Sequence, residues 1–309
     1  MSDQTELVQT WPEGFRAGFV AIVGRPNAGK STLTNAMVGQ KVAIMSDRPE
    51  TTRRAIRGVV HRAHGQLVLV DTPGLHRPRT LLGERLNEMV SETLGDVDVV
   101  IVCLPADEKI GPGDRYVIER AFETRRPVIA VVTKRDRLDR GALAEKLIAV
   151  DQLGDFAAII PTSGTVGTQV EDLVELLIEN LPESPPLYPP SAVSDESDEA
   201  MIAEFVREAA LEGVRDELPH SIAVVVEEMA ERPRKGGGTT LFIYTSVIVE
   251  RESQKSIVIG KRGERMRRIG SEARAQIEAR LGRPVYLDLH VKVSKDWQRD
   301  PKKLGRLGF

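Results

Sequence analysis

The segment that most constrains this chain is GRPNAGKS, residues 24–31, which directly follows the apolar run 19–23. Two glycines that frame four residues, followed by a lysine and a hydroxyl, are typical of a phosphate-binding loop between a buried strand and a helix. In such a loop the backbone N–H groups point at the β-phosphate, Lys30 adds a positive charge, and Ser31 supplies a hydroxyl for Mg²⁺. The sequence therefore predicts a nucleotide-binding α/β domain, with an incidental glycine-rich turn as the alternative.

Length and composition indicate two domains inside the cell. The chain has 309 residues, of which 41% are hydrophobic, enough for two separate cores. Its longest apolar runs, such as 97–104, which Asp98 interrupts, are too short to cross a bilayer, and residues 1–14 lack the features of a signal peptide. The only cysteine, Cys103, lies in that run, which predicts a small buried side chain and no disulfide within the chain. We therefore expect a cytoplasmic protein.

Charge is distributed unevenly along the chain. Residues 221–309 carry 19 Lys and Arg against 11 Asp and Glu, whereas residues 1–220 carry 24 against 35. The basic C-terminal segment suits a polyanion such as a nucleic acid, and the acidic remainder does not. Ordinary solvated charge is the alternative.

Short apolar strands alternate with amphipathic helical segments between residue 15 and about residue 181. This alternation predicts an α/β fold with a mostly parallel sheet and right-handed crossovers. Ligands are then expected at the carboxyl ends of the strands. The expected strands are 19–23, 67–70, 97–104, 128–132 and 157–160, and the expected helices include 80–94 and 170–181.

A stretch rich in proline and serine separates this unit from a second one. It predicts a semi-rigid linker, which divides the chain into a nucleotide-binding domain at 1–182, a linker at 183–197 and a basic domain at 198–309. The pattern of the basic domain predicts an α+β fold. Its expected elements are a helix from about 198, strands 222–226 and 241–249 around a turn at 236–238, a helix that reaches about 281, and strand 285–293.

Two segments of the first domain carry groups that suit Mg²⁺ and the γ-phosphate. Asp71 follows the strand 67–70, where its carboxylate can hold Mg²⁺ through a water, and Gly74 can offer its N–H to the γ-phosphate. Thr52 can close the Mg²⁺ shell only when the γ-phosphate is present, which would make the segment 41–54 an order–disorder switch. A plain turn at Asp71 and an ordinary loop at Thr52 are the alternatives.

The segment that follows strand 128–132 indicates which base is bound. Asp136 lies just after the carboxyl end of that strand. There its carboxylate can accept hydrogen bonds from both the N1–H and the N2 amino group of guanine, a pair of donors that adenine lacks. The segment 161–164 ends the last strand, where a backbone N–H can reach guanine O6. The sequence therefore predicts a guanine nucleotide.

A GxxG element predicts a nucleic-acid contact in the basic domain. The residues GKRG at 260–263 lie between the apolar segment 257–259 and a basic helix. In that context the glycines let a nucleic-acid backbone approach, and the adjoining helix and strand hold about four unstacked nucleotides. A helical corner with solvated arginines is the alternative, and Trp297 fits either a stacking role or core packing. The residues expected to contact RNA are Gly260, Lys261, Arg262, Gly263, Arg265, Arg267 and Arg268.

These motifs resemble those of a known family. GRPNAGKST, TTR, DTPG, TKRD and TSG have the order and spacing of the five guanine-nucleotide motifs of translation-factor-type small GTPases. One such domain, followed by VIGKRG in a basic domain that resembles the type II KH fold, is similar to the Era family of bacterial GTPases over nearly all of residues 15–309. The resemblance implies GTP hydrolysis, with GTP, GDP and Mg²⁺ bound.

The motifs assign roles to the matching positions. Ser31, Thr52 and Asp71 are the expected Mg²⁺ ligands, and Asn27, Lys30, Thr52 and Gly74 are expected to act in hydrolysis. The residues expected to contact the nucleotide are Gly24, Arg25, Pro26, Asn27, Ala28, Gly29, Lys30, Ser31, Thr32, Asp71, Thr72, Pro73, Gly74, Thr133, Lys134, Asp136, Thr162, Ser163 and Gly164.

Some positions change what the resemblance implies. Thr133 replaces an asparagine whose amide braces the base and the phosphate loop, which predicts weaker guanine affinity, and Gly164 replaces an alanine. Leu75 stands where Ras-like enzymes have a water-positioning glutamine, so we expect slow intrinsic turnover that needs outside help. His76 beside it is interpreted as a solvated bystander. By resemblance to potassium-activated GTPases, Asn27 is expected to hold K⁺ against the phosphates.

The resemblance also implies partners and a location. The expected partner is the 3′ region of 16S ribosomal RNA, and the expected role is maturation of the 30S subunit. The residues alone predict only single-stranded RNA or DNA, and the family implies no DNA target. A monomer is expected. Peripheral association with the inner face of the cell membrane is a family property, although no amphipathic anchor is recognisable in the sequence.

Two other functions fit part of the sequence. The first is an RNA-binding assembly factor whose nucleotide only stabilises the fold. The second is an ATP-dependent kinase, which is disfavoured by Asp136 and by the lack of a recognisable lid segment.

Overall fold

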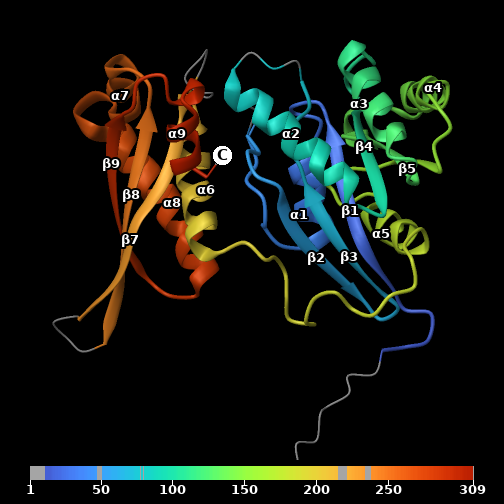
Figure 1. The fold of residues 1–309 in the computed structure, drawn as a ribbon, viewed down its shortest axis with the longest axis horizontal. Helices are drawn as coiled ribbons and strands as arrows, with labels where there is room; N and C mark the ends of the chain where they lie inside the picture. The colour runs from blue at the N-terminus through green and yellow to red at the C-terminus, as the bar shows by residue number, and fades with distance from the viewer. Residues whose placement is uncertain are drawn as a thin grey trace, which may run out of the picture.

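The computed structural model describes residues 11–46, 51–76, 78, 80–214, 221–233 and 238–308. Two units lie side by side, each built from one sheet and its helices (Figure 1). Among the described residues no helix is both long and apolar enough to cross a membrane. Cys103 is fully buried in the first unit, as the sequence predicts, and burial raises the pKa of its thiol to about 12.

Six strands form the sheet of the first unit in the order β2-β3-β1-β4-β5-β6. Neighbouring strands run parallel, except that β2 pairs antiparallel with β3. The five predicted strands are confirmed, whereas β2 was not predicted because a glycine and two arginines interrupt its apolar run. The strands are β1 (Arg16–Gly24), β2 (Ile56–Arg62), β3 (Gly65–Asp71), β4 (Val99–Pro105), β5 (Val128–Thr133) and β6 (Ala158–Pro161).

Helices cover both faces of this sheet, as a parallel sheet of apolar strands requires. Val20 and Ile22 of β1 pack in a core with residues of α1 and α5, whereas Ala21 and Val23 pack in a second core with residues of α2, α3 and α4. The helices are α1 (Lys30–Val38), α2 (Leu81–Gly95), α3 (Pro112–Glu123), α4 (Arg140–Asp151) and α5 (Val170–Glu179), with a short 3₁₀ helix η1 (Arg135–Arg137) after β5.

The second unit has the order that the sequence predicts, and its sheet runs β7-β8-β9 with β8 and β9 parallel. The predicted turn at 236–238 falls partly outside the described residues, because Gly236 and Gly237 are not among them. The elements are α6 (Asp198–Leu211), β7 (Ala223–Pro233), β8 (Thr239–Val249), α7 (Glu252–Ile259), η3 (Lys261–Gly263), α8 (Glu264–Leu281), β9 (Val285–Val293), η4 (Trp297–Arg299) and α9 (Pro301–Arg306).

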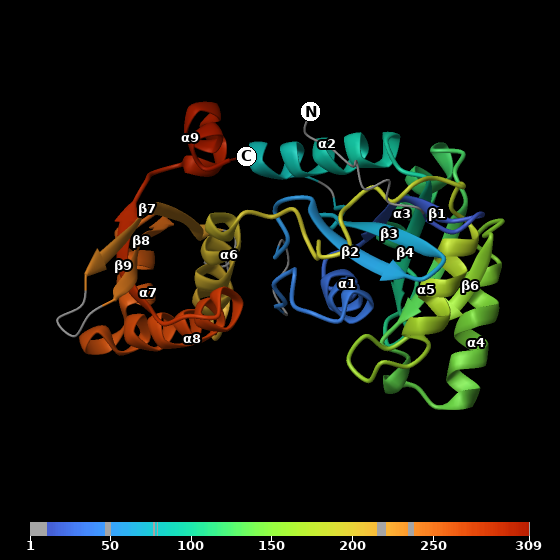
Figure 2. The ribbon, with the colours of Figure 1, turned by 90° about the horizontal axis from the view of Figure 1, so that it is seen from below.

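Helix α6 begins where its sequence favours a helix start. The side chain of Ser197 accepts a hydrogen bond from the N–H of Ala200, and Asp198 and Glu199 place negative charge in the first turn. Its apolar side packs with α8 against one face of the three-stranded sheet. Because α6 also lies beside the first unit, it forms part of the contact between the two units (Figure 2).

A second contact between the two units is apolar and joins helix α2 to the C-terminal helical segment of the chain. Leu82 and Leu86 of α2 share a small core with Trp297, Leu304 and Leu307 from η4, α9 and the residues after it. Trp297 is fully buried and its indole N–H donates to the carbonyl of Ser221. Core packing is therefore confirmed for Trp297, and a stacking role toward RNA is wrong.

The Pro-rich segment is not a free tether. The N–H of Val59 in β2 donates to the carbonyl of Val193, and Gln66 in β3 bonds the backbone of Leu187 and Tyr188. This segment thereby covers the outer edge of the sheet, which would otherwise present unpaired backbone groups.

Candidate functional site

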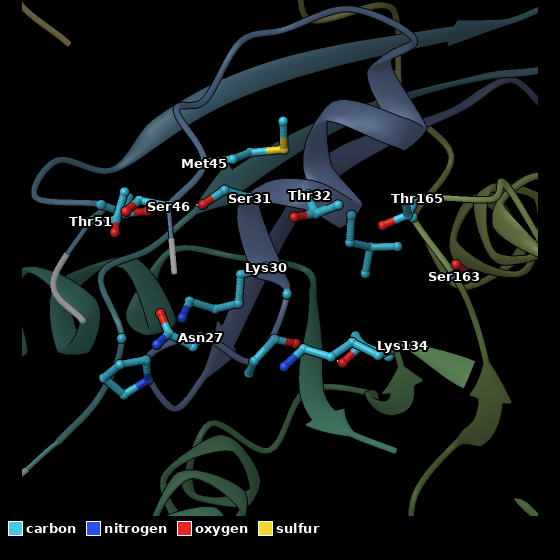
Figure 3. Close-up of a pocket in the computed structure, with 18 of the residues that line it drawn as sticks. Asn27, Lys30, Ser31, Thr32, Met45, Ser46, Thr51, Lys134, Ser163 and Thr165 are labelled. Carbon is cyan, nitrogen blue, oxygen red and sulfur yellow. Dashed lines mark hydrogen bonds between the residues drawn. The ribbon is translucent and has the colours of Figure 1, made fainter. Parts of the chain in front are cut away.

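A pocket lies at the carboxyl ends of the strands of the first sheet, where parallel sheets bind ligands. It has a volume of about 400 Å³. Figure 3 shows Asn27 and Lys30 side by side, Ser31 near Ser46 and Thr51, and Lys134, Ser163 and Thr165 on the opposite side of the view. The predicted residues that line it are Pro26, Asn27, Ala28, Gly29, Lys30, Ser31, Thr32, Thr52, Gly74, Thr133, Lys134, Ser163 and Gly164.

The other predicted nucleotide-site residues lie just behind or beside this wall. Asp71, Thr72 and Thr162 are fully buried, and the hydroxyl of Thr72 donates to the carbonyl of Ile22. Asp136 lies in η1 and is exposed, next to the lining residue Lys134. The structure also places Gly24, Arg25 and Pro73 outside the lining.

The phosphate loop holds its lysine in a buried position. Lys30 is 6% exposed, and its ammonium group donates to the carbonyls of Gly24 and Arg25 at 3.3 and 3.0 Å. Burial lowers the pKa of Lys30, and the nearby charge of Asp71 acts in the opposite direction. A cation held in a poorly solvated loop interacts strongly with an anion that enters the pocket.

Three oxygen-bearing side chains converge where Mg²⁺ is expected. The hydroxyls of Ser31 and Thr52 are 3.0 Å apart, and both belong to the pocket lining. Asp71 is fully buried, and neither of its carboxylate oxygens has a hydrogen-bond partner within normal geometry among the described residues. Hard oxygen donors of this kind fit Mg²⁺, which usually keeps some of its waters as bridges to a carboxylate. Mg²⁺ would supply charge neutralisation for the phosphates there.

The burial of Asp71 has a consequence for pH. Burial raises its pKa to about 6, against the opposing charge of Lys30. The ionised carboxylate accepts a hydrogen bond from a Mg²⁺-bound water more strongly than the protonated acid does, so the Mg²⁺ concentration that supports half-maximal nucleotide binding is expected to rise as pH falls below about 6, by up to about tenfold per pH unit. Titrating Mg²⁺ at pH 5 to 8 measures this effect.

The matched control is Asp71→Asn. In this variant the phosphates of the nucleotide still titrate, but residue 71 does not. The Mg²⁺ concentration for half-maximal binding should therefore change with pH only as far as the nucleotide itself is protonated. A wild-type curve that runs parallel to the Asp71→Asn curve would contradict the assignment.

The segment after Asp71 approaches the phosphate loop closely. A side chain at Gly74 would place its Cβ 2.7 Å from the backbone nitrogen of Pro26, so only glycine fits. The next residue, Leu75, is buried and its N–H donates to the carbonyl of Gly24. This placement agrees with the expectation that Leu75 does not orient a water. His76 is half-buried, with Nδ1 3.0 Å from the carbonyl oxygen of Gly74, so it is not the solvated side chain that we expected.

Thr133 partly replaces the asparagine that the family has at this position. Its hydroxyl is buried and donates to the carbonyl of Ala28 in the phosphate loop at 2.7 Å. The expected loss of the brace on the phosphate loop is therefore wrong, because a hydroxyl makes the contact in place of an amide.

The GxxG loop joins α7 to α8 through η3. A Cβ at Gly260 would lie 2.6 Å from the Cβ of Arg265, so the tight turn into α8 requires glycine there. Lys261 and Arg262 are exposed, and Lys261 lines a cavity of about 480 Å³ with Glu264, Arg265 and Arg268. The loop thus presents two cations to solvent beside a hollow.

The arginines of α8 are less free than the sequence suggests. Arg265 is half-buried and donates to the carbonyls of Ala210 and Glu212 at the end of α6. Arg267 donates to the carbonyl of Arg262 and so supports the loop. These two arginines hold the loop in shape, in addition to the positive charge that they contribute.

Comparison with known proteins agrees with this geometry. The family model described as 50S ribosome-binding GTPase matches residues 19–134, and the KH domain model matches residues 217–298. GTPase Era of Streptomyces coelicolor is 60% identical over 301 residues, and GTPase Era of Nocardioides sp. is 58% identical, each alignment covering at least 95% of both chains. The chain belongs to the Era family of GTPases.

Solved Era structures share the whole arrangement. Aquifex aeolicus Era Y63A bound to GDP·AlF₄⁻ has a TM-score of 0.91 at 36% identity and covers 95% of this chain and 99% of its own. An Era complex with MgGDPNP and nucleotides 1506–1542 of 16S ribosomal RNA has a TM-score of 0.89 at the same identity and coverage. The present chain is accordingly a GTPase that uses GTP, GDP and Mg²⁺, with a P-loop domain followed by a KH domain.

A network of ion pairs beside the Era nucleotide pocket was not predicted. Arg25 of the phosphate loop pairs with Asp114 of α3 at 2.7 Å and with Glu108 at 2.9 Å, and Asp114 is 2% exposed. Glu108 also lies 3.5 Å from the ammonium group of Lys134. This network ties the phosphate loop to the base-binding loop. Glu108 and Asp114 belong to no motif, so only the fold reveals their proximity.

Proposed function

We propose that this Era protein is a GTP-hydrolysing switch that binds 16S ribosomal RNA near its 3′ end and assists assembly of the 30S subunit. One observation carries the switching part of the proposal: described residues on both sides of 47–50 in the segment 41–54, which contains the proposed Mg²⁺ ligand Thr52, are in contact with the RNA-binding unit. Ile44 is buried among core residues of that unit, and Arg53 donates to the carbonyl of Ile222 at 2.6 Å. Loss of the γ-phosphate would therefore act on the contact between the units.

The target rests on chemistry and on a relative. The exposed cations of the GxxG loop suit unpaired RNA, and an Era relative of similar fold forms a complex with nucleotides 1506–1542 of 16S ribosomal RNA. We propose that Lys261 and Arg262 contact the RNA.

Crosslinking tests the target and the switch together. Full-length protein loaded with a non-hydrolysable GTP analogue or with GDP is crosslinked to a 16S fragment that contains the 3′ end, and to a fragment that lacks it. We expect crosslinks at the 3′ end that are stronger with the GTP analogue. Equal crosslinking in both nucleotide states, or to both fragments, would contradict the proposal.

Removing a loop cation should change the salt dependence of RNA binding. Lys261→Ala is expected to weaken binding to every single-stranded sequence and to reduce the slope of log K against log[salt] by about 0.7, because one fewer counterion is released. Fluorescence anisotropy at several salt concentrations measures the slope. Arg126→Ala, an exposed cation on the GTPase unit, is the matched control and should leave it unchanged.

We further propose that Asn27 holds K⁺ during hydrolysis. Asn27 lies beside Lys30 in the pocket and has a left-handed backbone, with φ of 62° (Figure 3). A cation there would neutralise charge that develops on the phosphates. Turnover is expected to be faster in KCl than in NaCl at equal ionic strength. Identical turnover rates in KCl and NaCl would contradict the proposed role of Asn27.

The location and the oligomeric state are proposals as well. We propose a monomer in the cytoplasm that can associate peripherally with the membrane. The division into 1–182, 183–197 and 198–309 is the domain organisation that we propose.

A further inference from the structure

Two adjacent residues of the RNA-binding unit, Arg207 and Glu208, form hydrogen bonds with the segment 41–54. Both lie on α6. One carboxylate oxygen of Glu208 accepts the backbone N–H of Met45 at 2.8 Å, and the other accepts the ammonium group of Lys41 at 2.6 Å. The guanidinium of Arg207 donates to the carbonyl of Thr51. The contacts therefore fall on both sides of residues 46–50 and next to Thr52.

The burial of Arg207 suggests that this contact is more than incidental. Arg207 is 2% exposed, although a guanidinium is costly to bury unless it is paired. Its Nε donates to Glu204 of the same helix at 2.9 Å, and its Nη2 reaches the carbonyl of Thr51 in the other unit. Its Nη1 has no partner within hydrogen-bond geometry among the described residues. The contact between the two units therefore supplies one of the hydrogen bonds that stabilise this buried charge.

The consequence reaches the Mg²⁺ site through one peptide bond. The carbonyl that Arg207 holds belongs to the peptide that joins Thr51 to Thr52, so fixing that carbonyl fixes the plane from which Thr52 projects. The hydroxyl of Thr52 then lies 3.0 Å from that of Ser31. Glu208 holds the segment at Met45, which, like Thr51 and Thr52, lines the pocket.

We propose that Arg207 and Glu208 are positioning residues of the GTPase site, supplied by the RNA-binding unit. They hold Thr52 in the arrangement that a triphosphate-bound site requires, so the docked unit raises the preference of the site for GTP over GDP. A contact favours a ligand only by its difference between the two states, and the diphosphate state does not need Thr52 in place. The inference deepens the proposed switch and rests on it for its effect on RNA, whereas the positioning itself concerns the nucleotide site.

The test measures two nucleotide affinities in the absence of RNA. Dissociation constants for a fluorescent non-hydrolysable GTP analogue and for fluorescent GDP are determined with saturating Mg²⁺ on the full chain. Arg207→Met is expected to weaken binding of the GTP analogue by about tenfold or more, the usual effect of losing a charged hydrogen bond, and to change GDP binding by less than about twofold. Arg207→Lys, which keeps a charged donor, should recover most of the loss.

The controls separate positioning from folding. Arg280→Met removes an arginine of α8 that pairs with Asp198 at 3.3 Å, away from the segment, and should leave both affinities unchanged. If Arg207→Met does not fold, Glu208→Gln carries the same comparison, because it keeps the shape of the side chain but loses the charge that Lys41 and Met45 contact. A parallel loss of both affinities, or no loss of either, would overturn the inference.

RNA binding measured on the same preparations keeps the two proposals apart. If wild-type protein binds the 16S fragment equally with GTP analogue and GDP, the proposed switch fails. A selective loss of GTP-analogue affinity in Arg207→Met would still support the positioning role in that case.

Discussion

Lys30→Ala is expected to reduce multiple-turnover phosphate release by at least about 100-fold, the usual effect of removing one preorganised charge that stabilises the transition state. Lys30 is buried at the bottom of the phosphate loop, where its ammonium group donates to the carbonyls of Gly24 and Arg25. Its positive charge is poorly solvated, so a phosphate oxygen that enters the pocket gains a strong partner. A malachite-green assay with excess GTP measures the release.

The fold should tolerate this substitution better than the activity does. Burial already lowers the pKa of Lys30, which means that its charge is held at a cost in the folded protein. The melting temperature without nucleotide is therefore expected to change little, whereas the increase in melting temperature on adding GTP and Mg²⁺ should be lost. Lys109→Ala, an exposed lysine outside the pocket lining, is the control.

The same assay decides between an enzyme and a nucleotide-stabilised RNA-binding factor. A factor that only carries its nucleotide would release phosphate at a negligible rate before and after the substitution. Turnover that depends on Lys30 excludes that alternative. Turnover that survives in Lys30→Ala would show that another group performs the role assigned to it.

The sequence predicts which segments meet around the pocket, because the chemistry of such a site depends on contiguous segments. Each segment is recognisable from its own residues: the phosphate loop, the strand that ends in Asp71 and the loop that carries Asp136. The parallel sheet then brings these segments together at one edge. The closeness of the Ser31 and Thr52 hydroxyls, 3.0 Å apart, agrees with the same prediction for Mg²⁺. None of these predictions needed knowledge of how distant side chains pack.

What the sequence does not show are contacts between residues of ordinary type. Trp297 near a basic C-terminus resembles a stacking residue, yet the packing of α9 on α2 buries it. Thr133 lacks an amide but places a hydroxyl at bonding distance from Ala28, which depends on the spacing of β1 and β5. Arg207 has the appearance of any helical arginine, and only the docking of α6 on the first unit reveals its partner in Thr51.

The second large effect is expected at the base-binding end of the pocket. Asp136→Asn should weaken GTP binding by about 10² to 10⁴-fold, because a carboxylate that accepts two guanine N–H groups makes two charged hydrogen bonds, each worth about 1.5–3 kcal/mol. Asp136 is exposed in the 3₁₀ turn after β5, so its replacement should not disturb the core. Competition of unlabelled nucleotides against fluorescent GDP measures the loss.

The variant should gain a different base as it loses guanine. Xanthine carries a carbonyl where guanine carries its amino group, and the amide of asparagine can donate to that carbonyl while its oxygen accepts the N1–H. Xanthosine triphosphate is therefore expected to bind Asp136→Asn more tightly than GTP does, and ATP should bind neither protein well. Asp155→Asn, exposed and outside the pocket lining, should keep the wild-type order. If Asp136→Asn retained full preference for GTP, the base would have to be read by other groups, such as the backbone around Ser163 and Gly164.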